Sequence, residues 1–138
     1  MPRLTEPRTV VVGYDGSDAA RAGIALAAEA AGTGGRVVVV TSLPRTDAPE
    51  LERGLTLVED PGRLLWEAEE LLRPHAVEVT TRVEEGDPAR VLASAAWEAD
   101  ADLIVVGARG SSYLARALRG SVAERLVARA PCALLVAR

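Results

Sequence analysis

The chain has 138 residues, about half of them apolar, and carries a formal net charge of −4 at neutral pH. This length indicates a single domain, 1–138, large enough to bury roughly two thirds of its unfolded surface. The acidic balance, without a basic stripe, argues against a nucleic-acid partner. No apolar run approaches the roughly 20 residues that cross a bilayer, and the N-terminus lacks the apolar core of a signal peptide. We therefore expect a cytoplasmic protein without a membrane partner.

The first part of the chain alternates short apolar runs with helical segments. A β-branched run over 9–14 predicts a strand, and the turn residues 15–18 lead into an alanine-rich helix over 17–31. A second strand is expected over 37–41. The stretch 44–62, rich in Pro, Asp, Glu and Arg, is interpreted as a long loop or a frayed helix start.

The second part continues the same alternation. Asp87-Pro88 is an N-cap and first-turn pair that marks a helix start. The expected elements are helix 63–73, strand 77–83, helix 89–99, strand 103–106, helix 122–130 and strand 132–137. Trp66 and Trp97 fall within two of these helices, and we expect both to pack against the core. His75 is interpreted as a solvated surface residue and Cys132 as a core residue.

Near-continuous valine, isoleucine and leucine runs at this spacing predict a parallel sheet covered by helices on both faces, an α/β doubly wound fold. In such a sheet, ligands bind beyond the carboxyl ends of the strands, where the strand order reverses. If the first strand lies between the second and the fourth, Asp15, Ser42 and Gly107 meet in one crevice. A carboxylate, a strand-end backbone and a glycine turn would then face one ligand, and a nucleotide fits this combination.

The glycines that follow the fourth strand form the most distinctive motif of the chain. Gly107 and Gly110 permit a tight turn and a close approach to a ligand, and nine residues separate Gly110 from Gly120-Ser121. A helix start behind Ser121 would offer free backbone N–H groups to an anion. We interpret the motif as a phosphate cradle. An ordinary strand-to-loop turn is the competing interpretation of the glycines, whereas a role of Ser121 as a helix N-cap is compatible with phosphate binding.

The spacing of this motif resembles that of the nucleotide-binding members of the universal stress protein family. The resemblance extends to the opening Val-Val-Gly-Tyr-Asp-Gly-Ser, to Asp-Leu-Ile-Val-Val-Gly and to the closing Pro-Cys-Ala-Leu-Leu-Val. It implies a five-stranded parallel sheet of order 3-2-1-4-5, similar to the adenine nucleotide alpha hydrolases. Family members commonly pair through the last strand, so a homodimer through the apolar edge candidate 132–137 is expected.

The resemblance also implies a role for each residue of the crevice. Asp15 corresponds to the aspartate that contacts the adenosine part, Ser42 to main-chain groups that hold adenine, and Gly107 to a residue that lines the ribose. The residues that correspond to phosphate contacts are Gly110, Gly120, Ser121 and Val122. For Asp15, capping of the first helix is the alternative role.

Two features add to or depart from the family pattern. Arg109 and Arg119 bring two positive charges to the cradle, and arginine pairs bidentately with phosphate oxygens. A solvated loop position is the alternative for Arg109. Gly13-Tyr14 stand where some relatives have Pro-Thr, which changes the expected wall of the adenine site.

The chain contains no lysine, so P-loop and phospho-receiver sites, which both need one, are excluded. No side-chain cluster indicates a metal-ligand set, and no catalytic residue is assigned. The expected function is an ATP-binding stress-response regulator that holds ATP, with or without Mg²⁺, turns it over little or not at all, and acts on an unidentified protein partner. The alternatives are a slow ATPase or phosphotransfer enzyme and a nucleotide-free dimeric interaction module.

Overall fold

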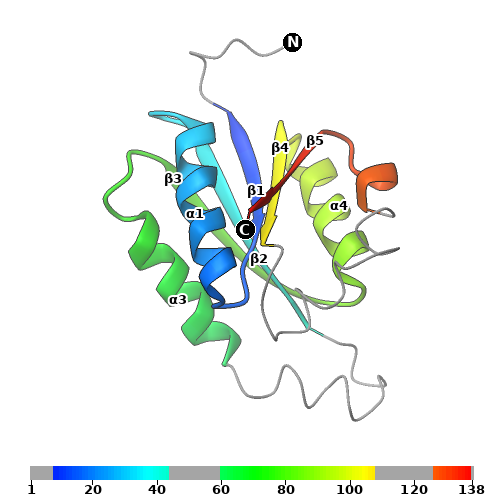
Figure 1. Cartoon of the computed structure of the whole chain (residues 1–138), viewed down its shortest axis with the longest axis horizontal. Coiled ribbons are helices and arrows are strands. Elements are labelled where there is room, and N and C mark those ends of the chain that lie inside the picture. The colour runs from blue at the N-terminus through cyan, green and yellow to red at the C-terminus, as the bar shows by residue number, and fades with distance from the viewer. Residues whose placement is uncertain (1–7, 44–59, 108–125, 138) are drawn as a thin grey trace.

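A five-stranded parallel sheet organises the computed structural model, which describes residues 8–43, 60–107 and 126–137 (Figure 1). In chain order the elements are β1 (Thr9–Gly13), α1 (Asp18–Ala31), β2 (Arg36–Leu43), α3 (Pro61–Leu72), β3 (Glu78–Glu85), α4 (Pro88–Ala99), β4 (Leu103–Gly107) and β5 (Ala133–Ala137). The strand order is β3-β2-β1-β4-β5, and every pairing is parallel. The predicted doubly wound α/β fold and its strand order are confirmed.

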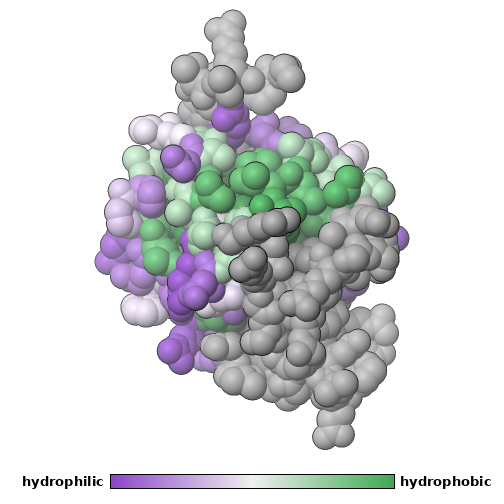
Figure 2. All heavy atoms as spheres, viewed as in Figure 1, coloured by the Kyte–Doolittle hydropathy of each residue, from purple (hydrophilic) through white to green (hydrophobic). Residues whose placement is uncertain are grey.

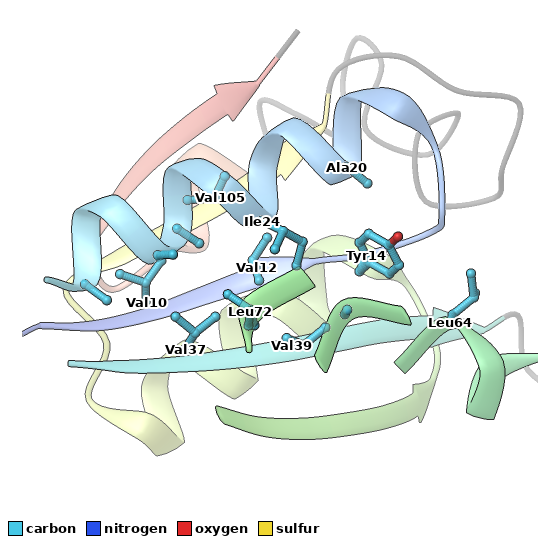
Figure 3. Close-up of a cluster of buried hydrophobic side chains, with 14 residues drawn as sticks. Val10, Val12, Tyr14, Ala20, Ile24, Val37, Val39, Leu64, Leu72 and Val105 are labelled. Atoms are coloured by element: carbon cyan, nitrogen blue, oxygen red, sulfur yellow. The ribbon is translucent and has the colours of Figure 1, made fainter. Parts of the chain in front are cut away.

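The alternation of side chains along β1 divides the interior into two apolar layers. Val10 and Val12 belong to a cluster with α1 and α3, whereas Val11 belongs to a cluster with α4 on the opposite face. Figure 3 shows the first layer, in which Ile24 of α1 and Leu72 of α3 meet the valines of the sheet. Both faces of the central strands are therefore dry, as the continuous valine runs predict.

Each of the three labelled helices begins at a polar side chain that accepts a backbone N–H group of the first turn. These caps are Ser17 for α1, Asp60 for α3 and Asp87 for α4. Because Pro61 follows the Asp60 cap, α3 begins two residues before the predicted start at residue 63. No helix in the described ranges is long and apolar enough to cross a membrane.

Both tryptophans point into solvent, so the prediction that they pack against the core is wrong. Trp66 is 62% exposed and Trp97 is 76% exposed. The buried stripe of α3 includes Leu64, and a residue two positions further lies about 200° around the helix from it. His75 is exposed as predicted, and Cys132 is half-buried against the cluster under α4.

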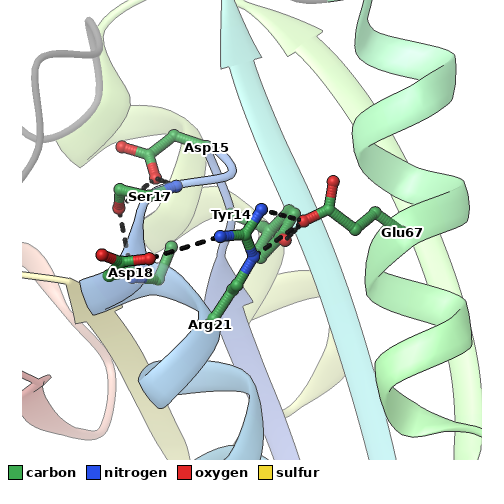
Figure 4. Close-up of polar contacts among 7 residues, drawn as sticks. Tyr14, Asp15, Ser17, Asp18, Arg21 and Glu67 are labelled. Atoms are coloured by element: carbon green, nitrogen blue, oxygen red, sulfur yellow. Dashed lines mark hydrogen bonds and ion pairs between the residues drawn. The ribbon is translucent and has the colours of Figure 1, made fainter.

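A polar link ties α1 to α3 beside the end of β1 (Figure 4). The Tyr14 hydroxyl donates to Glu67 Oε1 at 2.6 Å, and Arg21 donates to the same oxygen from Nε at 2.8 Å and from Nη2 at 2.6 Å. The hydrogen bond from Tyr14, aided by Arg21, holds the pKa of the Glu67 carboxyl below its ordinary value of 4.5. Ionised Glu67 therefore stabilises the folded chain at neutral pH.

We predict that Glu67→Gln destabilises the protein by about 1 kcal/mol at pH 7, because the neutral amide loses the ion pair with Arg21. A carboxyl with a lowered folded-state pKa contributes stability above its unfolded pKa and loses that contribution as the pH falls through the folded value. The difference between wild type and variant, measured by urea unfolding, should shrink as the pH drops below 4.5. Glu69→Gln, at an exposed position of the same helix, should show little difference at any pH. A Glu67→Gln difference that is constant with pH would contradict this account.

Candidate functional site

Three residues expected at the site come together at the carboxyl edge of the sheet. β1 lies between β2 and β4, and Val12 is paired with both neighbours at the same level. Asp15, Ser42 and Gly107 each lie two or three residues beyond that level on their own chain segments. The strand order reverses between β1 and β4, so this edge is the position where ligands bind in open parallel sheets.

Asp15 lies in a turn that its own side chain helps to build (Figure 4). Its Oδ1 accepts the backbone N–H of Ser17 at 2.9 Å and the Ser17 hydroxyl at 2.6 Å. The Ser17 hydroxyl oxygen in turn accepts the N–H of Ala20 at 3.2 Å, which makes Ser17 the N-cap of α1. Asp15 therefore orients the cap and does not cap the helix itself, so the alternative of direct capping by Asp15 is wrong.

Tyr14, which directly precedes Asp15, turns its ring away from this edge and into the first apolar layer (Figure 3). The side chain is fully buried, and burial together with the hydrogen bond to Glu67 raises the pKa of the Tyr14 phenol far above its ordinary value. The neutral phenol is thus held as a hydrogen-bond donor. Tyr14 at this position is a core residue and a polar anchor for the turn.

At Ser42 the hydroxyl proton is already used in a hydrogen bond within the protein, so the backbone is the part of this residue that is left for a ligand at the carboxyl edge. Its side chain is buried, and Oγ donates to the carbonyl of Gly86 at 3.1 Å, while the Gly86 N–H donates to the carbonyl of Leu43 at 2.8 Å. These two bonds fasten the end of β2 to the turn that follows β3. That the main-chain groups of Ser42, and not its side chain, contact a ligand remains a prediction.

Gly107 is required by packing against α1. A Cβ at this position would lie 2.9 Å from the backbone nitrogen of Ala20 and 3.0 Å from the carbonyl carbon of Ala19. Both atoms are backbone and have no room to move. The absence of a side chain lets the end of β4 reach the first turn of α1, close to the turn that carries Asp15.

The remaining predicted site residues lie outside the described residues, and their roles stay predictions. They are Arg109, Gly110, Gly120, Ser121 and Val122. Of the predicted helix 122–130, residues 126–130 are described, and of these 126–129 are helical. Within the described ranges no group of three or more His, Cys, Asp or Glu side chains could hold a metal ion.

Sequence reasoning missed two groups of polar contacts around Asp15. The Thr41 hydroxyl donates to the carbonyl of Tyr14 at 3.0 Å, and Glu67 binds the Tyr14 hydroxyl. Tyr14 lies in the opening stretch that resembles the family, but Glu67 is far from it in the chain and nothing in the sequence pairs the two residues. Only the packing of α3 against the end of β1 brings them together.

The chain matches a known protein family over nearly its whole length. The family model described as "Universal stress protein family" matches residues 6–138. A universal stress protein of Thermus aquaticus is 34% identical over 138 residues, which cover 95% of this chain and 98% of that protein. The structure of a universal stress protein in complex with cAMP has a TM-score of 0.70 and 26% identity, covering 95% of this chain and 97% of that one.

A second solved structure, the universal stress protein from Archaeoglobus fulgidus in complex with dAMP, has a TM-score of 0.68. It is 24% identical and covers 98% of this chain and 100% of that one, so it supports the fold. Because a family model matches nearly the whole chain and a relative shares a third of its residues end to end, this chain belongs to the universal stress protein family.

Proposed function

We propose that this protein binds an adenine nucleotide, ATP in particular, at the carboxyl edge of β1 and β4. The observation that carries the proposal is the position of Asp15, a carboxylate held in a fixed turn at the point where the strand order reverses. The similar universal stress protein solved in complex with cAMP supports an adenine nucleotide as the ligand class. The glycine motif of the sequence supports a phosphate-binding part of the same site.

Each part of the proposed site suits a different part of the ligand. A carboxylate accepts hydrogen bonds, which makes Asp15 suitable for the hydroxyl groups of the adenosine part. Backbone groups at the end of β2, near Ser42, suit the donors and acceptors of the adenine ring. Gly107 would line the ribose, and Gly110, Gly120, Ser121 and Val122 would contact the phosphates, with Arg109 adding positive charge.

We further propose that the nucleotide state is signalled to a protein partner with little or no turnover. The proposal rests on the sequence, which contains no lysine and therefore lacks the residue that P-loop enzymes use to hold the transferred phosphate. Among the proposed site residues, the Asp15 carboxylate is the one side chain that could act as a general base, and it is assigned to the adenosine part of the ligand. Mg²⁺ would enter with the phosphates of ATP.

Asp15→Asn tests the site directly. The amide oxygen still accepts the bonds from Ser17, so the turn is kept while the negative charge facing the ligand is removed. We expect the affinity for ATP, measured by titration calorimetry, to fall at least about tenfold, as loss of a charged hydrogen bond predicts. The matched control is Asp18→Asn, at a fully exposed carboxylate of the same turn, which should bind ATP as wild type does. Equal affinities for all three proteins would reject the role of Asp15.

Gly120→Val tests the phosphate-binding part. A branched side chain at this motif glycine would block close approach of the backbone to the phosphates, so ATP affinity should fall about tenfold or more. Calorimetric titration measures the affinity, and a cooperative thermal transition shows that the variant is folded. Unchanged affinity in a variant that still melts cooperatively would defeat the assignment of the motif to phosphate.

We also propose that two copies associate through β5. Among the described strands, β5 is one edge of the sheet, and Leu135 and Val136 on it are 38% and 46% exposed. Figure 2 shows hydrophobic residues gathered on the face of the molecule that carries β5. An exposed apolar edge strand is a site for pairing with another chain. A dimer would cover it.

The other edge strand, β3, is less suited than β5 to pair with a second copy. β3 carries Arg82, which forms ion pairs with Glu84 on its own strand and with Glu98 of α4. Charged side chains on an edge strand oppose pairing with a second chain. Association is therefore expected at one edge only.

Substituting one residue at each edge tests this proposal. Val136→Lys places a charge on the exposed apolar strand, and we expect the protein to change from dimer to monomer in sedimentation equilibrium. Val83→Lys is the matched control, because Val83 is 42% exposed on β3, and this variant should remain dimeric. A wild-type protein that is monomeric at micromolar concentration, or dissociation caused equally by both substitutions, would contradict a β5 interface.

A further inference from the structure

The two residues on either side of Asp15 are both held by α3. Tyr14, before it, donates its hydroxyl to Glu67 at 2.6 Å. Gly16, after it, lies directly under Leu64, because a Cβ at Gly16 would be 2.8 Å from Leu64 Cδ2. Leu64 and Glu67 are one turn apart on α3, so a single face of that helix contacts the turn at both points.

The backbone of Tyr14 is fixed as firmly as its side chain. Its N–H donates to the carbonyl of Val40 at 2.9 Å, which extends the β1–β2 pairing by one residue. Its carbonyl accepts the hydroxyl of Thr41, a buried residue of β2, at 3.0 Å. With the hydroxyl bound to Glu67, Tyr14 is anchored at three separate atoms.

The partner of Tyr14 is itself fixed. Glu67 Oε1 accepts from Nε and Nη2 of Arg21, and Arg21 also pairs with Asp18 at 3.3 Å in the first turn of α1 (Figure 4). The carboxylate of Glu67 therefore joins the end of β1, the start of α1 and the middle of α3.

Such bonding holds Asp15 in place before a ligand arrives. Gly16 has a φ of +81°, a conformation that favours glycine, and the Asp15 carboxylate is turned back onto Ser17. A binding group held in place by its neighbours loses less conformational freedom when the ligand binds. Loosening Tyr14 would let the turn and its carboxylate sample other positions.

We propose that Tyr14 is a positioning residue of the nucleotide site, which acts through Asp15 and takes its own position from Glu67 of α3. The inference rests on the proposed adenine nucleotide site. It goes beyond that proposal because Tyr14 faces the core and does not itself touch the ligand edge. The contact between α3 and the Asp15 turn thereby sets the strength of nucleoside binding.

A double-mutant cycle on ATP affinity tests the proposal. Tyr14→Phe keeps the buried ring and removes only the hydroxyl, and we expect it to weaken ATP binding about fivefold. Combined with Asp15→Asn, it should add almost no further loss, because the group it positions is already altered. Adenosine should show the same fivefold loss as ATP, since Asp15 is assigned to the nucleoside part.

Two further variants separate positioning from general destabilisation. Glu67→Gln keeps an oxygen that accepts the Tyr14 hydroxyl, so it should bind ATP nearly as wild type does, whereas Glu67→Ala should match Tyr14→Phe. Leu92→Val, in the apolar layer under α4 on the other face of the sheet, lowers stability without contacting the turn and should leave ATP affinity unchanged.

The outcomes distinguish this inference from the proposed function. If wild type binds ATP and Asp15→Asn weakens binding, but Tyr14→Phe does not, the positioning role is overturned and the nucleotide site stands. Fully additive losses in the double variant would show that Tyr14 acts independently of Asp15, and an equal loss in Leu92→Val would reduce its effect to stability. Absence of any binding of ATP or adenosine to wild type would overturn both.

Discussion

Parallel pairing of β1 with both β2 and β4 is the constraint on which the rest of the structure depends. It places β1 at the centre of the sheet, buries both of its faces, and brings the ends of three strands to one edge. From β1 the chain passes through α1 to β2 and then β3 on one side of β1, whereas β4 and β5 lie on the other side. The strand order therefore reverses beside β1. The proposed ligand would bind at this reversal, and Asp15 is the first residue with a charged side chain beyond the end of β1.

Hydrogen bonds next to that pairing also hold the turn that follows β1. The bond from the Tyr14 N–H to Val40 extends the sheet by one residue, and the hydroxyls of Thr41 and Ser42 then fasten the turns on the two sides of β2. Packing supplies the rest, since α3 presses on Gly16 and the first turn of α1 lies against Gly107. The glycine at 107 is thus explained by a close approach of backbone to backbone, whether or not a ribose also contacts this residue.

Local sequence patterns predict the described strands and the three labelled helices, whereas the strand order came from the resemblance to the family. The valine run of β1 and the Asp87-Pro88 pair of α4 both predict their elements to within a residue or two, because strand burial and helix capping are local effects. Trp66 and Trp97 were predicted wrongly because membership of a helix says nothing about the face on which a residue lies. The Tyr14–Glu67–Arg21 link was beyond sequence reasoning for a different reason. It depends on how α3 packs against α1, and no local pattern encodes that distance.

The central claim is that a nucleotide binds at the carboxyl edge of β1 and β4. Amide chemical shifts of the isotope-labelled protein, followed during titration with ATP, test it most directly. The account predicts that the largest changes occur at Asp15, Gly16, Ser42 and Gly107, with small changes at Thr9 and Asp102 at the amino ends of β1 and β4. Changes concentrated at these amino ends, or none at saturating ATP, would contradict the account.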